Sequence, residues 1–405
     1  MPDGAEPDAG HPTTAEPTTA RAAVVVSFTE DLLNGLLALV VGEGVPLDPL
    51  EQQVVLPAMG EVDLRLALTI TGGSLDLRAE DGGRARAVVT ADGDVSVRTA
   101  DYEGDVVEGA PLGLPELPAP IPVRVEALVD PMVELRDDRT VNVGLDLSRA
   151  ELVSLQVDPD APVPDGVDPG TWVPMTQMVQ VMFGSMGDGL FASLGEHVGS
   201  VGTDLGPDVG MVLHELGVDT GRATVGVGTG TLTFSLPARP DAEGVARPVP
   251  VAGNRLGVGA AAGAVDHLAH LLLERAIGNL PLPFELELDL GEQRVGGTLR
   301  QSRVLSDRLP DLRSALRTEI RPRLVGGRLE LTVQAAWVEL PSFLPGFVND
   351  LSRTVGGLAG AVPLRLRFPA TVALPLVPGS TDTVPVRVDD LRVTAEGVGV
   401  VLALD

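Results

Sequence analysis

Residues 52–158 alternate between apolar and polar side chains, and this alternation limits the chain to a strand-rich fold. A period of two places the apolar side chains of an extended strand on one face and the polar ones on the other. Turn sequences such as Gly72-Gly73 and Asp92-Gly93 separate many of the segments. The pattern predicts an antiparallel meander with one buried face. Its strands are expected at 62–70, 74–79, 84–90, 94–98, 123–129, 140–147 and 150–157.

Apolar residues at helical spacing predict four amphipathic helices, at 28–41, 174–204, 261–278 and 345–361. Before the first, Ser27 and Glu30 fit a capping box, in which each side chain satisfies a free backbone N–H of the other residue. A shorter Arg-rich helix is predicted where Leu305, Leu309, Leu312, Leu316 and Ile320 recur at helical spacing. Further strands are expected at 222–236, 284–290, 294–304, 327–340, 364–377 and 384–404.

The two halves of the chain repeat the same order of predicted elements: a helix, long alternating strands, a later apolar helix and a return to strand. This predicts an α+β fold of two consecutive units, each with long amphipathic helices packed against a highly curved antiparallel meander. Residues 1–22 are expected to form a disordered tail, 23–238 the first domain, 239–260 a Pro-, Ala- and Gly-rich linker and 261–405 the second domain.

The composition excludes several classes of function. The formal net charge of −28 disfavours binding to nucleic acid, whose phosphates would be repelled. The absence of cysteine removes disulfides, thiol nucleophiles and cysteine metal sites. We see no cleavable signal peptide and no apolar run long enough for a transmembrane helix. The expected location is the cytoplasm, with signal-independent export as the alternative.

The basic residues are unevenly placed. Nine arginines lie between Arg294 and Arg328, against three acids, so this segment has a local charge of about +6. One interpretation is a solvated face that complements the acidic N-terminal half. The other is a contact with an anion, a lipid headgroup or a partner protein. The candidate residues for such a contact are Arg308, Arg313 and Arg317.

Several short patterns contain residue types that occur in catalytic or metal sites, but each lacks a feature that such a site requires. His267 and His270 share a helix face, but a zinc or iron site needs more ligands than they provide. Ser185 lies within a predicted helix and not on the strand-to-helix turn of a hydrolase. The glycines around 257–263 lack the preceding buried strand of a dinucleotide site, and prolines interrupt the aspartates at 158–168. We therefore predict no enzymatic activity, no cofactor and no metal.

The predicted helix at 174–204 carries an apolar stripe that is rich in methionine. Methionine is flexible and polarizable, and it adapts to irregular apolar contacts. The stripe therefore predicts either an ordinary packed core or the lining of a site for a hydrocarbon ligand. Its residues include Met178, Met182, Phe183, Met186, Leu190 and Leu194.

The order of elements over residues 24–405 resembles the tubular lipid-binding (TULIP) superfamily, which includes the bactericidal/permeability-increasing and lipid-transfer proteins and the synaptotagmin-like lipid-binding domains. In that superfamily, lipid tails lie in a seam between a long helix and a strongly bent sheet. The resemblance implies a non-enzymatic protein that binds or transfers a lipid or fatty-acyl ligand; the alternative is a structural or assembly protein with a protein partner or a homo-oligomeric state. The seam residues that it implies are Leu33, Leu36, Met178, Met182, Phe183, Met186, Leu190, Leu194, Leu268, Leu272, Phe347 and Leu351. The chain lacks the cationic tip and the disulfide of the bactericidal members.

Overall fold

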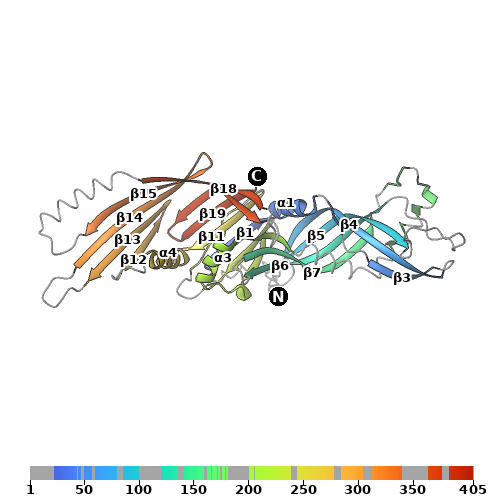
Figure 1. The fold of residues 1–405 in the computed structure, drawn as a ribbon, viewed down its shortest axis with the longest axis horizontal. Helices are drawn as coiled ribbons and strands as arrows, with labels where there is room; N and C mark the ends of the chain where they lie inside the picture. The colour runs from blue at the N-terminus through green and yellow to red at the C-terminus, as the bar shows by residue number, and fades with distance from the viewer. Residues whose placement is uncertain are drawn as a thin grey trace, which may run out of the picture.

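The fold was established from a computed structural model, and it is built mainly of antiparallel strands. The residues that the structure describes are 22–42, 44–46, 50–56, 60–79, 85–99, 120–135, 141–158, 162–165, 167–170, 172–173, 176–177, 179–180, 200–204, 206–238, 244–277, 284–303, 312–339, 364–375 and 383–404. Their strands form three sheets that follow one another along an elongated body (Figure 1).

The central sheet has seven strands in the order β17-β18-β19-β11-β1-β10-β9. Its strands are β1 (Val24–Thr29), β9 (Thr224–Gly228), β10 (Thr231–Leu236), β11 (Arg255–Ala261), β17 (Thr371–Pro375), β18 (Thr383–Thr394) and β19 (Gly397–Leu404). It therefore combines strands from both halves of the sequence. Six residues of β11, 255–260, belong to the segment that the sequence analysis assigned to a linker.

A second sheet lies at one end of the body and a third at the other (Figure 1). The second contains β2 (Val45–Pro46), β3 (Leu50–Leu56), β4 (Gly60–Ala79), β5 (Ala85–Thr99), β6 (Ile121–Leu135), β7 (Val141–Val157) and β8 (Ser200–Asp204). The third has the order β12-β13-β14-β15-β16, with β12 (Phe284–Gly291), β13 (Arg294–Arg303), β14 (Leu312–Val325), β15 (Arg328–Glu339) and β16 (Leu364–Pro369).

The predicted α+β class with long amphipathic helices is wrong, because the described elements are mostly strands. Three α-helices have their full bounds among the described residues: α1 (Glu30–Val41), α3 (Gly206–Glu215) and α4 (Ala262–Ile277), of 12, 10 and 16 residues. A single 3-10 turn, η1 (Thr220–Arg222), precedes β9. None of the described helices is long and apolar enough to cross a membrane.

The predicted Arg-rich helix at 305–320 is also wrong over its described part, because residues 312–320 belong to strand β14. Leu312, Leu316 and Ile320 are four positions apart. That spacing places side chains on one face of a helix, but also on one face of a strand, since four is a multiple of two. The pattern could not distinguish the two, and pairing with β13 and β15 decides it.

The predicted helix at 174–204 ends too late, because Ser200–Asp204 is the strand β8. Thr176, Gln177, Val179 and Gln180 are helical, as predicted, while residues 181–199 lie outside the described residues. The predicted helix at 345–361 lies outside them too. The helices predicted at 28–41 and 261–278 are confirmed as α1 and α4 with small changes at their ends.

The cap of α1 differs from the predicted capping box. Thr29 is the N-cap, and its hydroxyl accepts a hydrogen bond from the Leu32 N–H at 3.2 Å. Ser27 instead lies in β1, where its hydroxyl bonds that of Thr233. Glu30 accepts a hydrogen bond from the Leu77 N–H, which ties the start of the helix to β4. The strand β1 thus continues to residue 29, two positions beyond the predicted cap.

Glycines at which the sequence pattern predicts turns lie inside long strands. Gly72 is paired with Asp92, and the β4–β5 register shifts between Ile70 and Gly72. A Cβ on Gly93 would lie 2.7 Å from the Thr69 carbonyl oxygen, closer than real Cβ contacts allow. The glycines therefore permit an irregular, closely packed bend in one long strand pair, where the sequence pattern predicted four shorter strands separated by turns.

An approximate twofold axis relates the two halves of the central sheet. The neighbours β1 and β11 are antiparallel, with Val26 opposite Val258. These residues are 232 positions apart (258 − 26), as are Glu30 and Ala262, the first residues of α1 and α4 (262 − 30). The hairpins β9–β10 and β18–β19 flank this pair, and each has a two-residue turn. The part of the chain from β1 to β10, which we call the first unit, and the part from β11 to β19, which we call the second unit, thus share the order of an inner strand, a helix and, later, a flanking hairpin.

Candidate functional site

The five-stranded sheet β12–β16 has two faces of opposite character, because its strands alternate and pair in register. Ile320 of β14 lies opposite Val295 of β13 and Val333 of β15, and Val333 lies opposite Leu364 of β16. The described aliphatic and aromatic side chains that share this face, which we call the apolar face, are Leu286, Leu288, Leu290, Val295, Leu299, Leu316, Ile320, Leu324, Leu329, Leu331, Val333, Leu364, Leu366 and Phe368.

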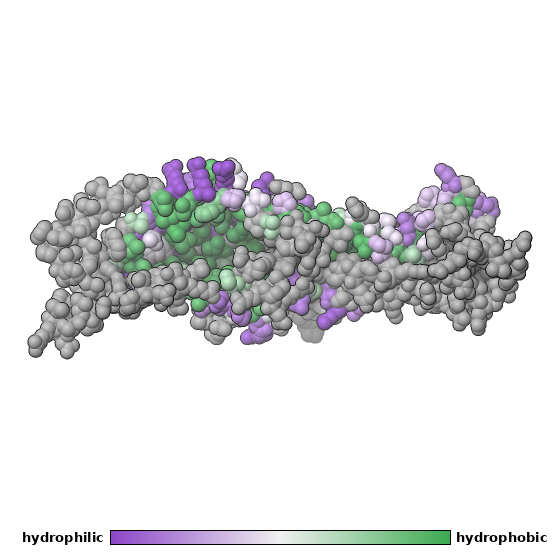
Figure 2. All heavy atoms as spheres, in the orientation of Figure 1, coloured by the Kyte–Doolittle hydropathy of each residue, from purple (hydrophilic) through white to green (hydrophobic). Residues whose placement is uncertain are grey.

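The apolar face is only partly shielded from water. Its residues on β12 to β15 are partly buried, and on β16 Leu364, Leu366 and Phe368 are 59%, 38% and 44% exposed. Figure 2 shows apolar side chains gathered in a hollow in the half of the molecule where Figure 1 places β12–β15. A contiguous apolar surface of this kind marks a site of interaction with a ligand, a membrane or a protein.

The opposite side of the sheet, which we call the reverse face, is charged. Acidic residues alternate with leucine on β12, and arginines alternate with apolar residues on β14 and β16. Arg300 forms an ion pair with Glu287 at 3.0 Å, and Arg367 forms one with Glu330 at 3.0 Å. The charges hold the reverse face in solvent, so the sheet presents its apolar face to whatever covers it.

Among the described residues, the corresponding seam in the first unit, between α1 and the sheet β2–β8, is closely packed. Leu33 is fully buried and Leu36 is 5% exposed, and both belong to the main hydrophobic core. A cavity of about 20 Å³ remains beside Leu37, between α1 and the β4–β5 bend. This is the space of a single water molecule, and it is too small for an acyl chain.

Polar groups fix α1 on this sheet. The Asn34 side chain accepts a hydrogen bond from the Leu75 N–H and donates one to the Leu75 carbonyl.

On the sheet, Arg86 is nearly buried and its guanidinium bonds Glu151 at 2.9 Å and Asp130 at 3.1 Å. The hydrogen bond with Glu151 raises the pKa of Arg86 above its usual value. Arg86, Asp130 and Glu151 thus connect β5, β6 and β7, and stabilising the sheet is a sufficient explanation for this buried charge.

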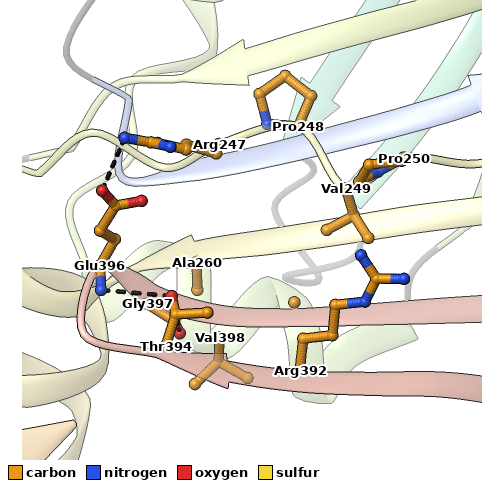
Figure 3. Close-up of a pocket in the computed structure, with 11 residues that line it drawn as sticks. Arg247, Pro248, Val249, Pro250, Ala260, Arg392, Thr394, Glu396, Gly397 and Val398 are labelled. Carbon is orange, nitrogen blue, oxygen red and sulfur yellow. Dashed lines mark hydrogen bonds and ion pairs between the residues drawn. The ribbon is translucent and has the colours of Figure 1, made fainter. Parts of the chain in front are cut away.

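A second cavity, of about 220 Å³, lies where residues 247–250 cross β11 and β19 (Figure 3). The crossing is close, because a Cβ on Gly259 would lie 2.6 Å from the Arg247 carbonyl oxygen. Arg247 pairs with Glu396 at 2.6 Å across the mouth, and Arg392 pairs with Asp390 at 2.6 Å. Both arginines on the cavity wall thus have a carboxylate partner, which leaves little net charge for an anion.

The described residues include part of the predicted site. Leu33 and Leu36 lie in the filled first seam, and Leu268 lies on α4, partly buried against the core. Leu272 is also on α4, and Arg313 and Arg317 are on β14, with Arg317 exposed on the reverse face. The remaining candidates lie outside the described residues: Met178, Met182, Phe183, Met186, Leu190, Leu194, Phe347, Leu351 and Arg308.

The apolar face is not among the predicted site residues, although the alternation that produces it is visible in the sequence. Residues 364–368, Leu-Arg-Leu-Arg-Phe, alternate without interruption, and their strand was predicted but not treated as a site. In the part of the chain that the structure describes, no three histidine, aspartate or glutamate side chains cluster as metal ligands. His270, one of the two histidines weighed as ligands, lies with Nδ1 2.8 Å from the Asp266 carbonyl oxygen.

Comparison with protein-family models and with curated proteins finds no match. Among solved structures, the chain is similar to lipopolysaccharide binding protein, with 12% identity, a TM-score of 0.33 and coverage of 95% of this chain and 98% of that one. It is also similar to P47 from Clostridium botulinum A2, with 8% identity, a TM-score of 0.36 and coverage of 96% and 98%. Scores this low indicate a distant resemblance in fold and say nothing about the ligand of this chain.

Proposed function

We propose that this protein binds a lipid or another hydrophobic ligand without catalysing a reaction, and that the hydrocarbon part of the ligand lies on the apolar face of β12–β16. The observation that supports this most directly is the partial exposure of an aliphatic surface that extends across all five strands and is interrupted on β14 by Thr318. Each buried CH₂ group of a ligand contributes about 0.8 kcal/mol, so one acyl chain covering this face would bind usefully.

The proposed binding site lies in the second unit, whereas most of the site residues predicted from the sequence lie in the first. The predicted site centred on α1 and the methionine-rich helix, but the described part of the α1 seam is occupied by the protein's own side chains. On the apolar face, Leu329 and Leu331 lie opposite Phe368 and Leu366, and the last two are exposed. Space for a ligand is therefore supported in the second unit.

Adjacent positions on β15 provide a sharp test. Leu331 lies on the apolar face and Thr332 on the reverse face. We would extract the freshly purified protein with organic solvent, identify lipids by mass spectrometry, and titrate the protein with a fluorescent fatty acid. We expect bound acyl species, lost in Leu331→Glu and retained in Thr332→Glu. Should Leu331→Glu fail to fold, Val333→Thr preserves the side-chain shape and should weaken binding several-fold.

Two results would contradict the proposal. If the wild-type protein carries no lipid and takes up no fatty acid, it does not bind such ligands. If lipid is present but both variants retain it equally, the ligand lies elsewhere. In the first case the filled core of the first unit favours the second candidate function, a structural or assembly protein that uses the fold as a scaffold.

A further inference from the structure

The two edge strands of the β12–β16 sheet carry opposite charge. β12 reads Phe-Glu-Leu-Glu-Leu-Asp-Leu-Gly, and β16 reads Leu-Arg-Leu-Arg-Phe-Pro. In both strands the apolar residues belong to the apolar face and the charged residues to the reverse face. One edge of the sheet is therefore acidic and the other basic, with the same alternation.

Both edges are accessible in the described structure. All six residues of β16 are exposed, and the Arg367 side chain is 61% exposed. On β12, the side chains of Glu287 and Asp289 are 65% and 57% exposed. An edge strand offers unpaired backbone N–H and C=O groups to another strand, and a long exposed edge tends to recruit one.

The charges of the two edge strands favour one pairing, beyond the ion pairs that Glu287 and Asp289 form with β13 and that Arg367 forms with β15. Two β16 strands side by side would bring Arg365 and Arg367 against the same residues of another copy, and two β12 strands would do the same with their acids. Like charges opposite each other destabilise a strand pair, while opposite charges stabilise it. The edge that complements β16 is therefore β12.

Strand direction agrees with this pairing. Four successive antiparallel pairings separate β12 from β16, so the two strands run in the same direction. If a second copy is placed beside the first with its apolar face on the same side, its β12 is parallel to β16 of the first. Parallel strands occur in mixed sheets, and this arrangement would continue both the apolar face and the reverse face.

We propose that copies of this chain associate head to tail, with β16 of one copy paired in parallel with β12 of the next. Arg365 and Arg367 then lie beside Glu285, Glu287 and Asp289. Such a heterologous interface closes into a ring or continues as a filament, depending on the rotation between copies. The inference does not depend on the ligand, since it uses the edges of the sheet and not its apolar face.

Sedimentation velocity over a range of protein concentrations tests the proposal. The wild-type mass should rise above the 42.0 kDa of one chain, and added salt should lower it again. Arg365→Glu/Arg367→Glu should weaken association about tenfold or more. The matched control, Arg317→Glu/Arg321→Glu, changes charge equally on the same face but on the inner strand β14, where the paired residues of β15 are the uncharged Ala336 and Thr332, and it should assemble like the wild type.

Complementary variants test the choice of edge. Glu285→Arg/Glu287→Arg should also be monomeric alone, and an equimolar mixture with Arg365→Glu/Arg367→Glu should assemble again. If Arg365→Glu/Arg367→Glu loses the far-UV circular dichroism signal of the folded protein, the milder variant Arg365→Gln/Arg367→Gln replaces it. A wild-type chain that stays monomeric overturns the proposal. It is also overturned if the β16 edge of a monomeric chain binds an acidic strand of another protein instead of a second copy. Normal assembly of the β12 variant alone also overturns it.

Discussion

Truncating one leucine in each unit distinguishes a filled core from an open apolar face. Leu33 of α1 is completely buried in the first unit, and Leu331 of β15 is partly buried on the apolar face of the second. Leu33→Ala loses the transfer energy of the removed carbons and leaves a cavity, which together cost about 3–5 kcal/mol. At Leu331 the space would open to solvent, so only part of the transfer energy is lost, about 1 kcal/mol.

Urea denaturation followed by far-UV circular dichroism measures both changes, with the slope of each transition checked against the wild type. Thr332→Ala, on the reverse face of the same strand, controls for strand propensity and should change stability by less than about 0.5 kcal/mol. Equal losses of about 3–5 kcal/mol for Leu33→Ala and Leu331→Ala would refute the reasoning. They would show that the apolar face is covered as closely as the seam under α1.

Three further predictions concern single contacts. Leu331→Ala should raise the Kd for a fluorescent fatty acid about tenfold, and Thr332→Ala should leave it unchanged, as fluorescence titration would show. Thr29→Ala should destabilise the protein by about 1–2 kcal/mol in thermal unfolding, because it removes the N-cap of α1, while Thr29→Ser should retain most of the stability. Gly93→Ala should cost about 1–3 kcal/mol in the same assay, since its Cβ would clash with the Thr69 carbonyl oxygen; a neutral result would show that the bend can relax.

The sequence predicted strands more reliably than helices, for a physical reason. Alternation over many residues correctly placed strand residues in β4 to β7 and in β12, β13 and β15, although it divided β4, β5 and β7 into shorter strands. Apolar residues spaced four apart satisfy both a helix and a strand, so the spacing of Leu312, Leu316 and Ile320 led to the wrong element. The intervening arginines at 317, 321 and 323, which continue the alternation, were the evidence for a strand.

Long-range pairing explains what the sequence could not show. β1 pairs with β11 across more than half of the chain, and no local pattern identifies such partners. Of the candidate site, the sequence indicated apolar helices, but whether a seam is filled depends on how closely opposing side chains meet. Leu33 and Leu331 are both leucines in amphipathic elements, and only the packing around them shows that one is in a core and the other on an open face.

The apolar face and the two charged edges belong to one sheet, so ligand binding and self-association should influence each other. Head-to-tail pairing of β16 with β12 would continue the apolar face from one copy to the next, and a hydrocarbon chain crossing the junction would contact both copies. A ligand that binds the assembled state more tightly must favour assembly, and assembly must raise its affinity by the same factor.

This coupling can be measured by sedimentation velocity with and without a fatty acid. We expect fatty acid to shift the wild-type association to lower protein concentration, and to shift it less in Leu331→Ala, which retains both edges but binds the ligand more weakly. The Arg317→Glu/Arg321→Glu variant should respond like the wild type, because it changes neither the apolar face nor an edge. An association that fatty acid leaves unchanged, in a protein that binds it, would contradict this coupling, because it would show that the ligand binds the free and the assembled protein equally tightly.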